Sequence, residues 1–321
     1  MVDGGTQDKA PRIAVIMPVH NRRLVVGRAI DSVLRQDFPD FELIVVDDGS
    51  TDGTVDVISA NIDPRVRVIR QDGQRGANAA RNRGVRESCA PVIAFLDSDD
   101  EYLPQKLSAV LAAFDRESDL GALVDSYAIV NPRKYGGRPE ALTNAVIETS
   151  GEFLAALFTS TIKSRRIRKA TSGITVRRDV ALRAGLFAEG VERRQDMEFL
   201  ARLAKVARCA TTDRVLWTKY EQADSISFTG NGFIAATLVM HRIHPEYSMQ
   251  GRHMPGDIVI YFWETLKRKR YGRVASDLKM LVANLGAIPT LSLLGRGLWA
   301  WMADPRIARR DDRKSCSLRG D

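Results

Sequence analysis

Two clusters of carboxylates follow short apolar runs, and they are the residues of this sequence best suited to chemistry. Asp47 and Asp48 follow the run 41–46, and the acidic segment 97–100 (DSDD) follows the run 91–96. Each run is short, largely apolar and bounded by turn-forming residues, which is typical of a buried strand. Two such strands side by side would gather several negative charges at one edge of a sheet, which is unfavourable without a positive partner. The pattern therefore predicts a site for a divalent cation that carries a diphosphate.

The first third of the chain alternates between strand-like and helix-like patterns that would position these carboxylates. Strands are predicted at 12–17, 41–46, 66–69 and 92–96, and helices at 22–36, 54–60, 77–87 and 104–114. Alternating strands and helices indicate an α/β fold with a mostly parallel sheet covered on both faces. Ligands bind beyond the carboxyl ends of the strands in such sheets. The segments 18–21, 47–48 and 97–100 lie at those ends, so we expect them to share one site.

The rest of the chain is less regular. Strands are predicted at 120–130, 171–176 and 208–220, helices at 151–158 and 196–207, and a loop at 131–139. Beyond about residue 228 the pattern is helical and increasingly basic. We therefore expect a helical extension after the α/β domain.

The chain is basic, with a formal net charge of +8 over 321 residues. Basic runs at 163–169 and 267–270 could contact an anionic partner or form solvated surfaces. The sequence has no zinc-finger spacing and no aromatic RNA-binding strand, so no nucleic-acid partner is expected. The three cysteines lack metal-like spacing and favour a reducing compartment, which predicts a cytoplasmic protein.

The stretch 281–302 is the part of the chain most similar to a membrane-binding segment. Asn284, Pro289 and Arg296 interrupt it, so a spanning helix is not predicted. Trp299 and Trp301 precede a basic tail, which suits an interfacial segment on anionic lipid. Two alternatives stay open: peripheral attachment to the inner face of the membrane, and a terminal helix packed on the core.

Five motifs, taken together, resemble one enzyme family. They are IMPVHN at 16–21, IVVDDGSTDGT at 44–54, GANAARNRG at 76–84, FLDSDD at 95–100 and QDMEF at 195–199. In this order they closely resemble the GT-A fold, family 2 glycosyltransferases, and the likeness runs from about Arg12 to Ser227. A single D-x-D motif occurs widely by chance, whereas five motifs in order are specific. The resemblance implies a nucleotide-diphospho-sugar donor, with a UDP-sugar expected, and a transfer that inverts the sugar carbon.

The resemblance also implies which residues bind the nucleotide. Pro18, Val19 and Asn21 would line the nucleotide pocket, and Asp48 would receive the base. Because side chains alternate along a strand, only one of Asp47 and Asp48 should face the ligand. The other would cap the turn that follows, since Asp-Gly sequences are strong turn formers.

The metal and phosphate ligands implied by the resemblance lie mainly in the acidic segment. Asp99 would bind Mg²⁺ or Mn²⁺ directly, while Asp97 would reach the ion, its bound water or a ribose hydroxyl, and Ser98 would contact the donor. One or two carboxylates suffice because phosphate and water complete the coordination. Arg75 or Arg81 would approach the base or phosphates. The alternative for Arg81 is a solvated position on an exposed helix face.

The reaction also needs a base. Displacing the diphosphate from the opposite face of the sugar requires a carboxylate that removes the proton of the acceptor hydroxyl, and Asp196 matches the base of the family. At the position before Asp196, where the family usually has an acidic residue, this sequence has Gln195. Some relatives carry a histidine ahead of an aspartate-serine-isoleucine-serine stretch, but 221–227 has none. The metal would therefore depend mainly on Asp99 and the donor.

We therefore predict four segments and one principal function. The segments are a disordered tail at 1–11, a GT-A domain at 12–228, a helical extension at 229–302 and a basic flexible tail at 303–321. The expected function is sugar transfer to a glycan or lipid-linked acceptor in cell-envelope or exopolysaccharide biosynthesis. A catalytically degenerate nucleotide-sugar-binding protein is the alternative, favoured by Gln195. A nucleotidyltransferase is a weaker one, because its Gly-rich phosphate loop after the first strand is missing.

Overall fold

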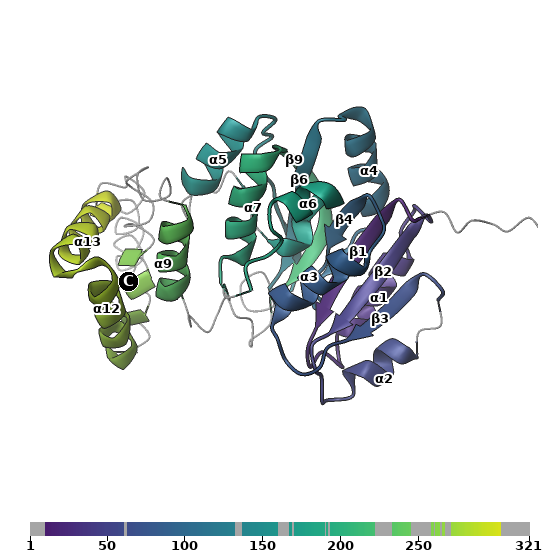
Figure 1. Ribbon diagram of the computed structural model, residues 1–321, viewed down its shortest axis with the longest axis horizontal. Helices are drawn as coiled ribbons and strands as arrows, with labels where there is room; N and C mark the ends of the chain where they lie inside the picture. The colour runs from purple at the N-terminus through teal and green to yellow at the C-terminus, as the bar shows by residue number, and fades with distance from the viewer. Residues whose placement is uncertain are drawn as a thin grey trace, which may run out of the picture. The chain divides into compact units, whose positions relative to one another are not determined.

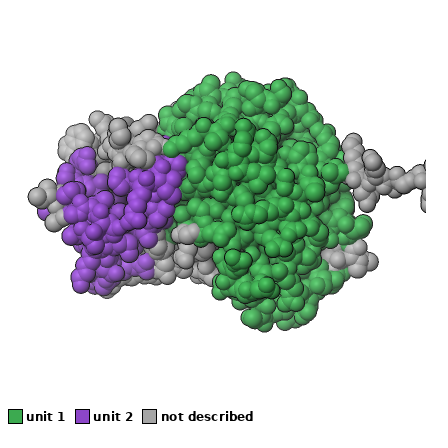
Figure 2. All heavy atoms as spheres, viewed as in Figure 1, with its two compact units in different colours: residues 1–157, 166–225 green, residues 158–165, 226–321 purple. Residues whose placement is uncertain are grey.

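The chain forms two compact units. The computed structural model describes residues 10–60, 63–131, 137–159, 167–168, 170–189, 191, 193–221, 233–244, 258–259, 261–263, 265–266 and 271–302. Residues 1–157 and 166–225 make the first unit, and residues 158–165 and 226–321 make the second (Figure 2). The division near residue 225 lies close to the boundary expected at 228, but the sequence pattern did not separate 158–165 from the α/β domain. The expected tails lie outside the described residues, apart from residues 10 and 11.

The described residues of the first unit build a nine-stranded sheet with the order β3-β2-β1-β4-β8-β6-β9-β5, and β7 also pairs with β6 (Figure 1). The strands are β1 (Ile13–Val19), β2 (Phe41–Asp47), β3 (Val66–Arg70), β4 (Val92–Phe95), β5 (Glu101–Tyr102), β6 (Leu120–Val130), β7 (Pro139–Leu142), β8 (Ile174–Arg177) and β9 (Arg208–Tyr220). Strands β1 to β4 are parallel, and β8 is antiparallel to both β4 and β6. Because β4 and β6 are both antiparallel to β8, β6 runs in the same direction as β4 and β1. Strand β9 is parallel to β6 and therefore runs in that direction too. The predicted mostly parallel α/β sheet is confirmed.

Helices cover both faces of this sheet. The first unit contains α1 (Val26–Leu34), α2 (Thr54–Ser59), α3 (Ala77–Glu87), α4 (Lys106–Arg116), α6 (Arg178–Arg183) and α7 (Gln195–Val206), and α5 (Ser150–Thr159) follows β7 in the chain. Alternate residues of β1, such as Ile13 and Val15, pack in one core cluster with α1 and α4. The residues between them face α3. A Cβ on Gly84 would lie 2.5 Å from Cγ2 of Ile16, so only glycine allows α3 to pack this closely on β1.

Several elements differ from the predicted pattern. Helix α1 begins at Val26 rather than at residue 22, because Arg22 donates its backbone N–H to Thr54 Oγ1 (2.8 Å) in a turn. Residues 171–173 form a 3₁₀ turn instead of a strand, so β8 begins later than expected. Strands β5 and β7 and helix α6 were not predicted. Both strands are short: β5 depends on the distant strand β9, and β7 pairs with the end of the preceding strand β6 in a segment that was expected to begin as a loop.

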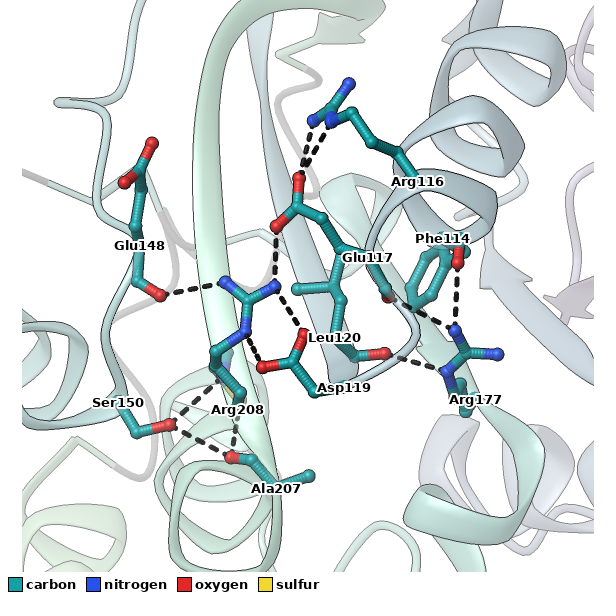
Figure 3. Close-up of polar contacts among 11 residues, drawn as sticks. Phe114, Arg116, Glu117, Asp119, Leu120, Glu148, Ser150, Arg177, Ala207 and Arg208 are labelled. Atoms are coloured by element: carbon teal, nitrogen blue, oxygen red, sulfur yellow. Dashed lines mark hydrogen bonds and ion pairs between the residues drawn. The ribbon is translucent and has the colours of Figure 1, made fainter.

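An arginine cluster holds the sheet at the amino ends of β6 and β9 (Figure 3). Arg208 begins β9 and forms ion pairs with Glu117 (2.5 Å) and Asp119 (2.8 Å) in the turn before β6. Arg208 also donates to the backbone carbonyl of Glu148 (3.0 Å). Arg177 donates to the carbonyl of Leu120 at 2.8 Å. These contacts fix the edge of the sheet opposite to the carboxyl ends of its parallel strands.

The described part of the second unit is helical. It contains α9 (Phe233–Ile243), α12 (Tyr271–Leu285) and α13 (Ala287–Met302). Among the described residues, none of the helices has by itself the length and apolar character needed to cross a membrane. Helix α12 together with Pro289–Arg296 meets both requirements as a pair, but the pair is bent by 120°.

Candidate active site

The carboxyl ends of β1, β2 and β4 lie side by side because β1 pairs in parallel with both neighbours. Pro18 and Val19 are buried in the last part of β1, and Val19 is opposite Asp47. The start of the reversed strand β8 reaches the same edge. There Ser172 accepts a hydrogen bond from the backbone N–H of Asp97 (3.0 Å) and donates to Asp100 (2.7 Å).

The turn after β1 is bonded to the loop after β2. Asn21 has a left-handed backbone (φ +50°), and its N–H donates to Ser50 Oγ (2.9 Å). Its side-chain oxygen accepts from the N–H of Thr51 (2.9 Å). Asp47 is fully buried and accepts from the N–H of Ser50 (3.2 Å). Asp47 therefore caps the turn, as expected for one member of the aspartate pair.

Asp48, the other member, anchors the segment that leads into α3. Its carboxylate accepts hydrogen bonds from Gln71 Nε2 (2.7 Å) and from the backbone N–H groups of Arg75 (2.7 Å) and Gly76 (2.8 Å). A carboxylate has about four acceptor positions, so about one remains for a donor N–H of a ligand. Arg75 binds Asp48 through its backbone, and its side chain is exposed.

His20 has a defined tautomer in this arrangement. Its Nδ1 lies 2.9 Å from the backbone carbonyl of Asp48, which can only accept, so Nδ1 carries the proton. Its Nε2 then accepts from Asn21 Nδ2 at 3.2 Å. His20 thus joins the ends of β1 and β2 as a structural link at this edge of the sheet.

The acidic segment is only partly exposed. The Asp97 side chain is 27% exposed, whereas Ser98 and Asp100 are buried. Burial and the neighbouring Asp97 raise the pKa of Asp99. Burial also raises the pKa of Asp100 to about 7, and the carboxylate of Asp100 accepts from the N–H of Tyr220 at 3.3 Å. Asp100 is therefore a support for the segment, and Asp97 and Asp99 are the carboxylates open to a ligand.

Lys219 is a candidate site residue that the sequence pattern did not indicate. It lies near the carboxyl end of β9, opposite Ile129, and is half-buried. The carboxylate of Asp100, followed by those of Asp97 and Asp99, raises the pKa of Lys219. No sequence pattern near the acidic segment predicts that Lys219 lies beside it, because only the pairing of β9 in the sheet brings this lysine to the acidic segment.

Arg81 joins helix α3 to the acidic segment. Its side chain is 3% exposed and donates to Asp97 Oδ1 (2.7 Å) and Asn78 Oδ1 (2.9 Å). Its guanidinium carbon lies 5.3 Å from the ring centre of Phe187. The alternative interpretation of Arg81 as a solvated surface residue is therefore wrong. The helix face that carries it is packed against the loop before α7.

The same helix holds the segment that leads to α7. Asn78 Nδ2 donates to the carbonyls of Ala188 and Val191, each at 2.8 Å. Asn82 accepts from the N–H of Phe187 (2.9 Å) and donates to its carbonyl (2.9 Å). Helix α3 and the turn before it thus contact Asp48, the acidic segment and the 187–191 segment, which explains why one polar motif covers 76–84.

Aromatic packing brings the first turn of α7 to the carboxyl end of β4. The ring of Phe199 lies 6.2 Å from Phe95, the last residue of β4, and 4.1 Å from Phe187. Asp196 is half-buried, one turn before Phe199, and accepts from the N–H of Met197 (2.7 Å). Asp196 therefore lies at the same edge of the sheet as the acidic segment.

The neighbours of Asp196 differ in environment. Gln195, the first residue of α7, is half-buried. Glu198 is 1% exposed and forms an ion pair with Arg202 (2.6 Å), so its carboxylate is used inside the fold. Of the three, Asp196 is the carboxylate suited to contact an acceptor.

The described residues contain no cluster of three or more metal-ligating His, Cys, Asp or Glu side chains. One carboxylate oxygen of Asp97 accepts a hydrogen bond from Arg81. Asp99 forms no ion pair with another described residue. Two carboxylates match the way proteins hold Mg²⁺, with one or two acidic side chains and the remaining positions filled by phosphate and water. The residues present therefore fit a cation that binds together with a diphosphate.

A family model described as "Glycosyl transferase family 2" matches residues 14–174, about half of the chain. This chain belongs to that family. The match includes the ends of β1, β2 and β4, helix α3 and the 3₁₀ turn that contacts the acidic segment. The resemblance to family 2 glycosyltransferases that the motifs indicated is confirmed.

Curated relatives match part of the chain. The putative colanic acid biosynthesis glycosyl transferase WcaA of Escherichia coli K12 is 41% identical over 104 residues, 32% of this chain and 37% of the relative. The putative teichuronic acid biosynthesis glycosyltransferase TuaG of Bacillus subtilis is 40% identical over 103 residues, 32% of this chain and 41% of the relative. The E. coli protein WfgD is 29% identical over 143 residues, 43% of this chain and 56% of the relative. The chain thus matches between about a third and a little over half of the relatives' length.

Solved structures confirm the GT-A fold. Staphylococcus aureus TarS 1–349, in complex with UDP-GlcNAc, has a TM-score of 0.59 at 20% identity, covering 72% of this chain and 66% of TarS. The mannosyltransferase PcManGT of Pyrobaculum calidifontis, in complex with GDP-Man and Mn²⁺, has a TM-score of 0.53 at 18% identity, covering 93% of this chain and 82% of PcManGT. At these identities the likeness is one of fold.

Proposed function

We propose that this family 2 member transfers a sugar from a nucleotide-diphospho-sugar to a hydroxyl group, with inversion at the sugar carbon. The observation that carries the proposal is the grouping of Asp48, the acidic segment and the segment that leads into α7 around helix α3. Each group suits one part of the reaction: base binding, diphosphate binding and proton removal. The transfer needs all three within one site.

The donor is expected to be a UDP-sugar. Asp48 keeps about one acceptor position for the N–H of a base, beside the buried end of β1 at Pro18 and Val19. Asn21 and Ser98 border the same edge, and the exposed Arg75 side chain could reach the phosphates. UDP-GlcNAc is bound in TarS, which supports a nucleotide-sugar donor of this class.

The reaction is expected to depend on Mg²⁺ or Mn²⁺. Asp99, with help from Asp97, would hold the ion, and the ion would neutralise the negative charge that grows on the diphosphate leaving group. Lys219 and Arg22 would add positive charge beside it, since both lower the pKa of Asp99. PcManGT binds Mn²⁺ with its nucleotide sugar, which supports the same chemistry here.

Asp196 is the proposed general base. Its half-buried carboxylate would accept the proton of the acceptor hydroxyl as that oxygen attacks the sugar carbon from the face opposite the diphosphate. Gln195 cannot accept a proton in this way, so the base function would rest on Asp196 alone. A catalytically degenerate binding protein remains the second candidate, because Gln195 replaces the family's usual acidic residue.

The acceptor is expected to be a glycan or a lipid-linked glycan precursor of the cell envelope or an exopolysaccharide. WcaA and TuaG are named for polysaccharide biosynthesis, and WfgD is named for a diphosphoundecaprenol acceptor. A lipid-linked acceptor would suit peripheral attachment of the second unit to the inner face of the membrane. Liposome flotation at low salt tests this, and absence of binding to anionic vesicles would remove the membrane part of the proposal.

A donor screen by calorimetry tests the function. UDP, GDP and their sugars would be titrated with Mn²⁺ or Mg²⁺ into the wild type, Asp99→Ala and Asp196→Asn. Metal-dependent binding should be lost in Asp99→Ala and kept in Asp196→Asn, while turnover in Asp196→Asn should fall by about 10²–10⁴. Asp179→Asn, an exposed carboxylate on α6, is the matched control. Absence of any metal-dependent signal in the wild type would contradict the proposal, and unchanged turnover in Asp196→Asn would favour the degenerate binder.

A further inference from the structure

Helix α1 carries a polar stripe along an otherwise apolar buried face. The stripe consists of Arg28 and Ser32, which lie four residues apart on one side of the helix, and it continues in Gln36, two residues beyond the helix end at Leu34. Ser32 and Gln36 are buried, and Arg28 is half-buried. Buried polar side chains are stable only with hydrogen-bond partners. All three find those partners in the segment 99–107, which begins in the acidic segment.

Ser32 and Gln36 hold the far part of that segment. Ser32 Oγ accepts from the N–H of Tyr102 (3.1 Å). Gln36 donates to the carbonyl of Leu103 (2.8 Å) and accepts from the N–H of Leu107 (2.9 Å). These bonds satisfy backbone groups at the end of β5, in the turn after it and in the first turn of α4. The segment after Asp100 is therefore attached to a rigid helix.

Arg28 holds the beginning of the segment 99–107, at Asp99, the proposed metal ligand. Its Nη2 donates to the backbone carbonyl of Asp99 (2.8 Å), and its Nε lies 2.8 Å from Glu101 Oε1. Its guanidinium carbon lies 3.8 Å from the centre of the Tyr220 ring, a close cation–π contact. The Tyr220 hydroxyl donates to Glu101 (3.1 Å). Arg28 thus connects α1, the acidic segment and the end of β9.

These contacts engage two of the three guanidinium nitrogens, Nη2 and Nε, and one flat face of the group. One nitrogen binds a main-chain carbonyl, one faces a carboxylate and the flat face covers an aromatic ring. The two engaged nitrogens both point to the 99–101 segment. Arg28 is therefore suited to place another residue rather than to contact substrate.

We propose that Arg28, supported by Ser32 and Gln36, is a positioning residue that fixes the main chain at Asp99 so that this carboxylate is held ready for a cation. The inference rests on the metal-dependent reaction proposed above. Asp99 stands between Asp97 and Asp100, and three neighbouring carboxylates repel one another when ionised. Without a tether on the main chain, Asp99 would be free to turn away, and a cation would have to supply the energy of reordering it.

The test measures cation binding rather than turnover. Mn²⁺ would be titrated calorimetrically into wild type, Arg28→Met and Arg28→Lys in the presence of saturating UDP. Arg28→Met should weaken Mn²⁺ binding about tenfold or more, as is usual when a group that supports a metal ligand is removed. Arg28→Lys keeps the charge but cannot make all three contacts, so it should weaken binding by a smaller factor. The control is Arg35→Met, just beyond the end of α1, whose exposed side chain lies 3.8 Å from the exposed Asp31.

Each outcome bears either on the role of Arg28 or on the proposed function. Wild-type affinity for Mn²⁺ in a folded Arg28→Met protein would overturn the inference while leaving the proposed function intact. If Arg28→Met does not fold, the same reading applies to Arg28→Lys, with thermal unfolding as the check on folding. Absence of Mn²⁺-dependent UDP binding in the wild type would instead contradict the proposed function. Tyr220→Leu, which removes the ring beneath Arg28, should weaken binding more than Tyr220→Phe, and equal affinities in the two variants would count against the role given to the stacked ring.

Discussion

Lys106 and Asp125 form an ion pair inside the core of the first unit, and separating them is a direct test of what that pair contributes. Both side chains are fully buried, Lys106 at the start of α4 and Asp125 in β6. Burial lowers the pKa of Lys106 and raises the pKa of Asp125 to about 6, although each charge opposes the shift of its partner. Each charge is therefore stable in the core only while the other is present.

The expected magnitude follows from this mutual dependence. Removing one partner of a buried pair typically costs about 3–5 kcal/mol. We expect Lys106→Met to cost ~3 kcal/mol, because Asp125 can limit the loss by taking up a proton. With an m-value of ~3 kcal/mol/M, the urea midpoint should fall by ~1 M. The double variant Lys106→Met/Asp125→Leu removes both charges and should lie within ~1 kcal/mol of the wild type.

Asp125 gives this loss a pH dependence of known sign. Its folded pKa of about 6 lies above the ordinary value of 3.8, so its contribution to stability is present at low pH and is lost as the pH rises through about 6. Lys106→Met should raise the folded pKa further. The destabilisation relative to wild type should therefore be larger at about pH 8 than at about pH 5.

Urea unfolding of the wild type, Lys106→Met, Asp125→Leu and the double variant measures these quantities. Trp217 is the only tryptophan of the first unit and is fully buried, so its fluorescence follows the unfolding of that unit. Two results would refute the reasoning. One is that each single variant lies within ~1 kcal/mol of wild type, and the other is that the double variant loses as much as the two single variants together.

Two further predictions concern packing and the arginine cluster. Gly84→Ala should destabilise the first unit by ~1–3 kcal/mol, because the new methyl group would overlap Ile16, while Gly151→Ala, which meets nothing within 4 Å, should not. Chemical unfolding of both variants checks this, and equal stability would argue against close packing of α3 on β1. Hydrogen bonds from Arg208 lower the pKa of Glu117, so the stability that Glu117 contributes is present above about pH 4.5 and lost as the pH falls through its folded pKa. Glu117→Gln should therefore cost up to ~1 kcal/mol near neutral pH and nothing in strong acid, and a loss that persists in acid would contradict this.

The carboxyl edge of the sheet could be predicted because its signals are local. Short apolar runs ending in aspartates identify β2 and β4, and their alternation with helices indicates a parallel sheet in which those ends meet. The aspartate pair could also be divided in advance, since side chains alternate along a strand. Asp47 caps its turn and Asp48 anchors the approach to α3.

The partners of the acidic segment could not be predicted, because they come from elements distant in sequence. Lys219 reaches it only through the pairing of β9 with β6. The spacing of Arg28, Ser32 and Gln36 is visible in the sequence, but a polar stripe on a helix is usually a solvated face, and nothing local shows that this one is buried. Arg81 was open to the same ambiguity, and the structure resolves it in favour of a buried contact with Asp97.

The distribution of positive charge around the acidic segment explains why Asp99 is the best candidate for a metal ligand. Arg81 is bonded to Asp97, and Asp100 is held by Ser172 and by the backbone of Tyr220, with Lys219 as its main counter-charge. Asp99 has no direct hydrogen bond from another described residue to its carboxylate, and burial disfavours its charge. The fold thus compensates two of three neighbouring carboxylates and tethers the main chain of the third. A cation that arrives with a diphosphate would therefore find the least compensated carboxylate at Asp99. Substitution of Asp99 should abolish metal-dependent nucleotide binding. Substitution of Asp97, which is already paired with Arg81, should only weaken it.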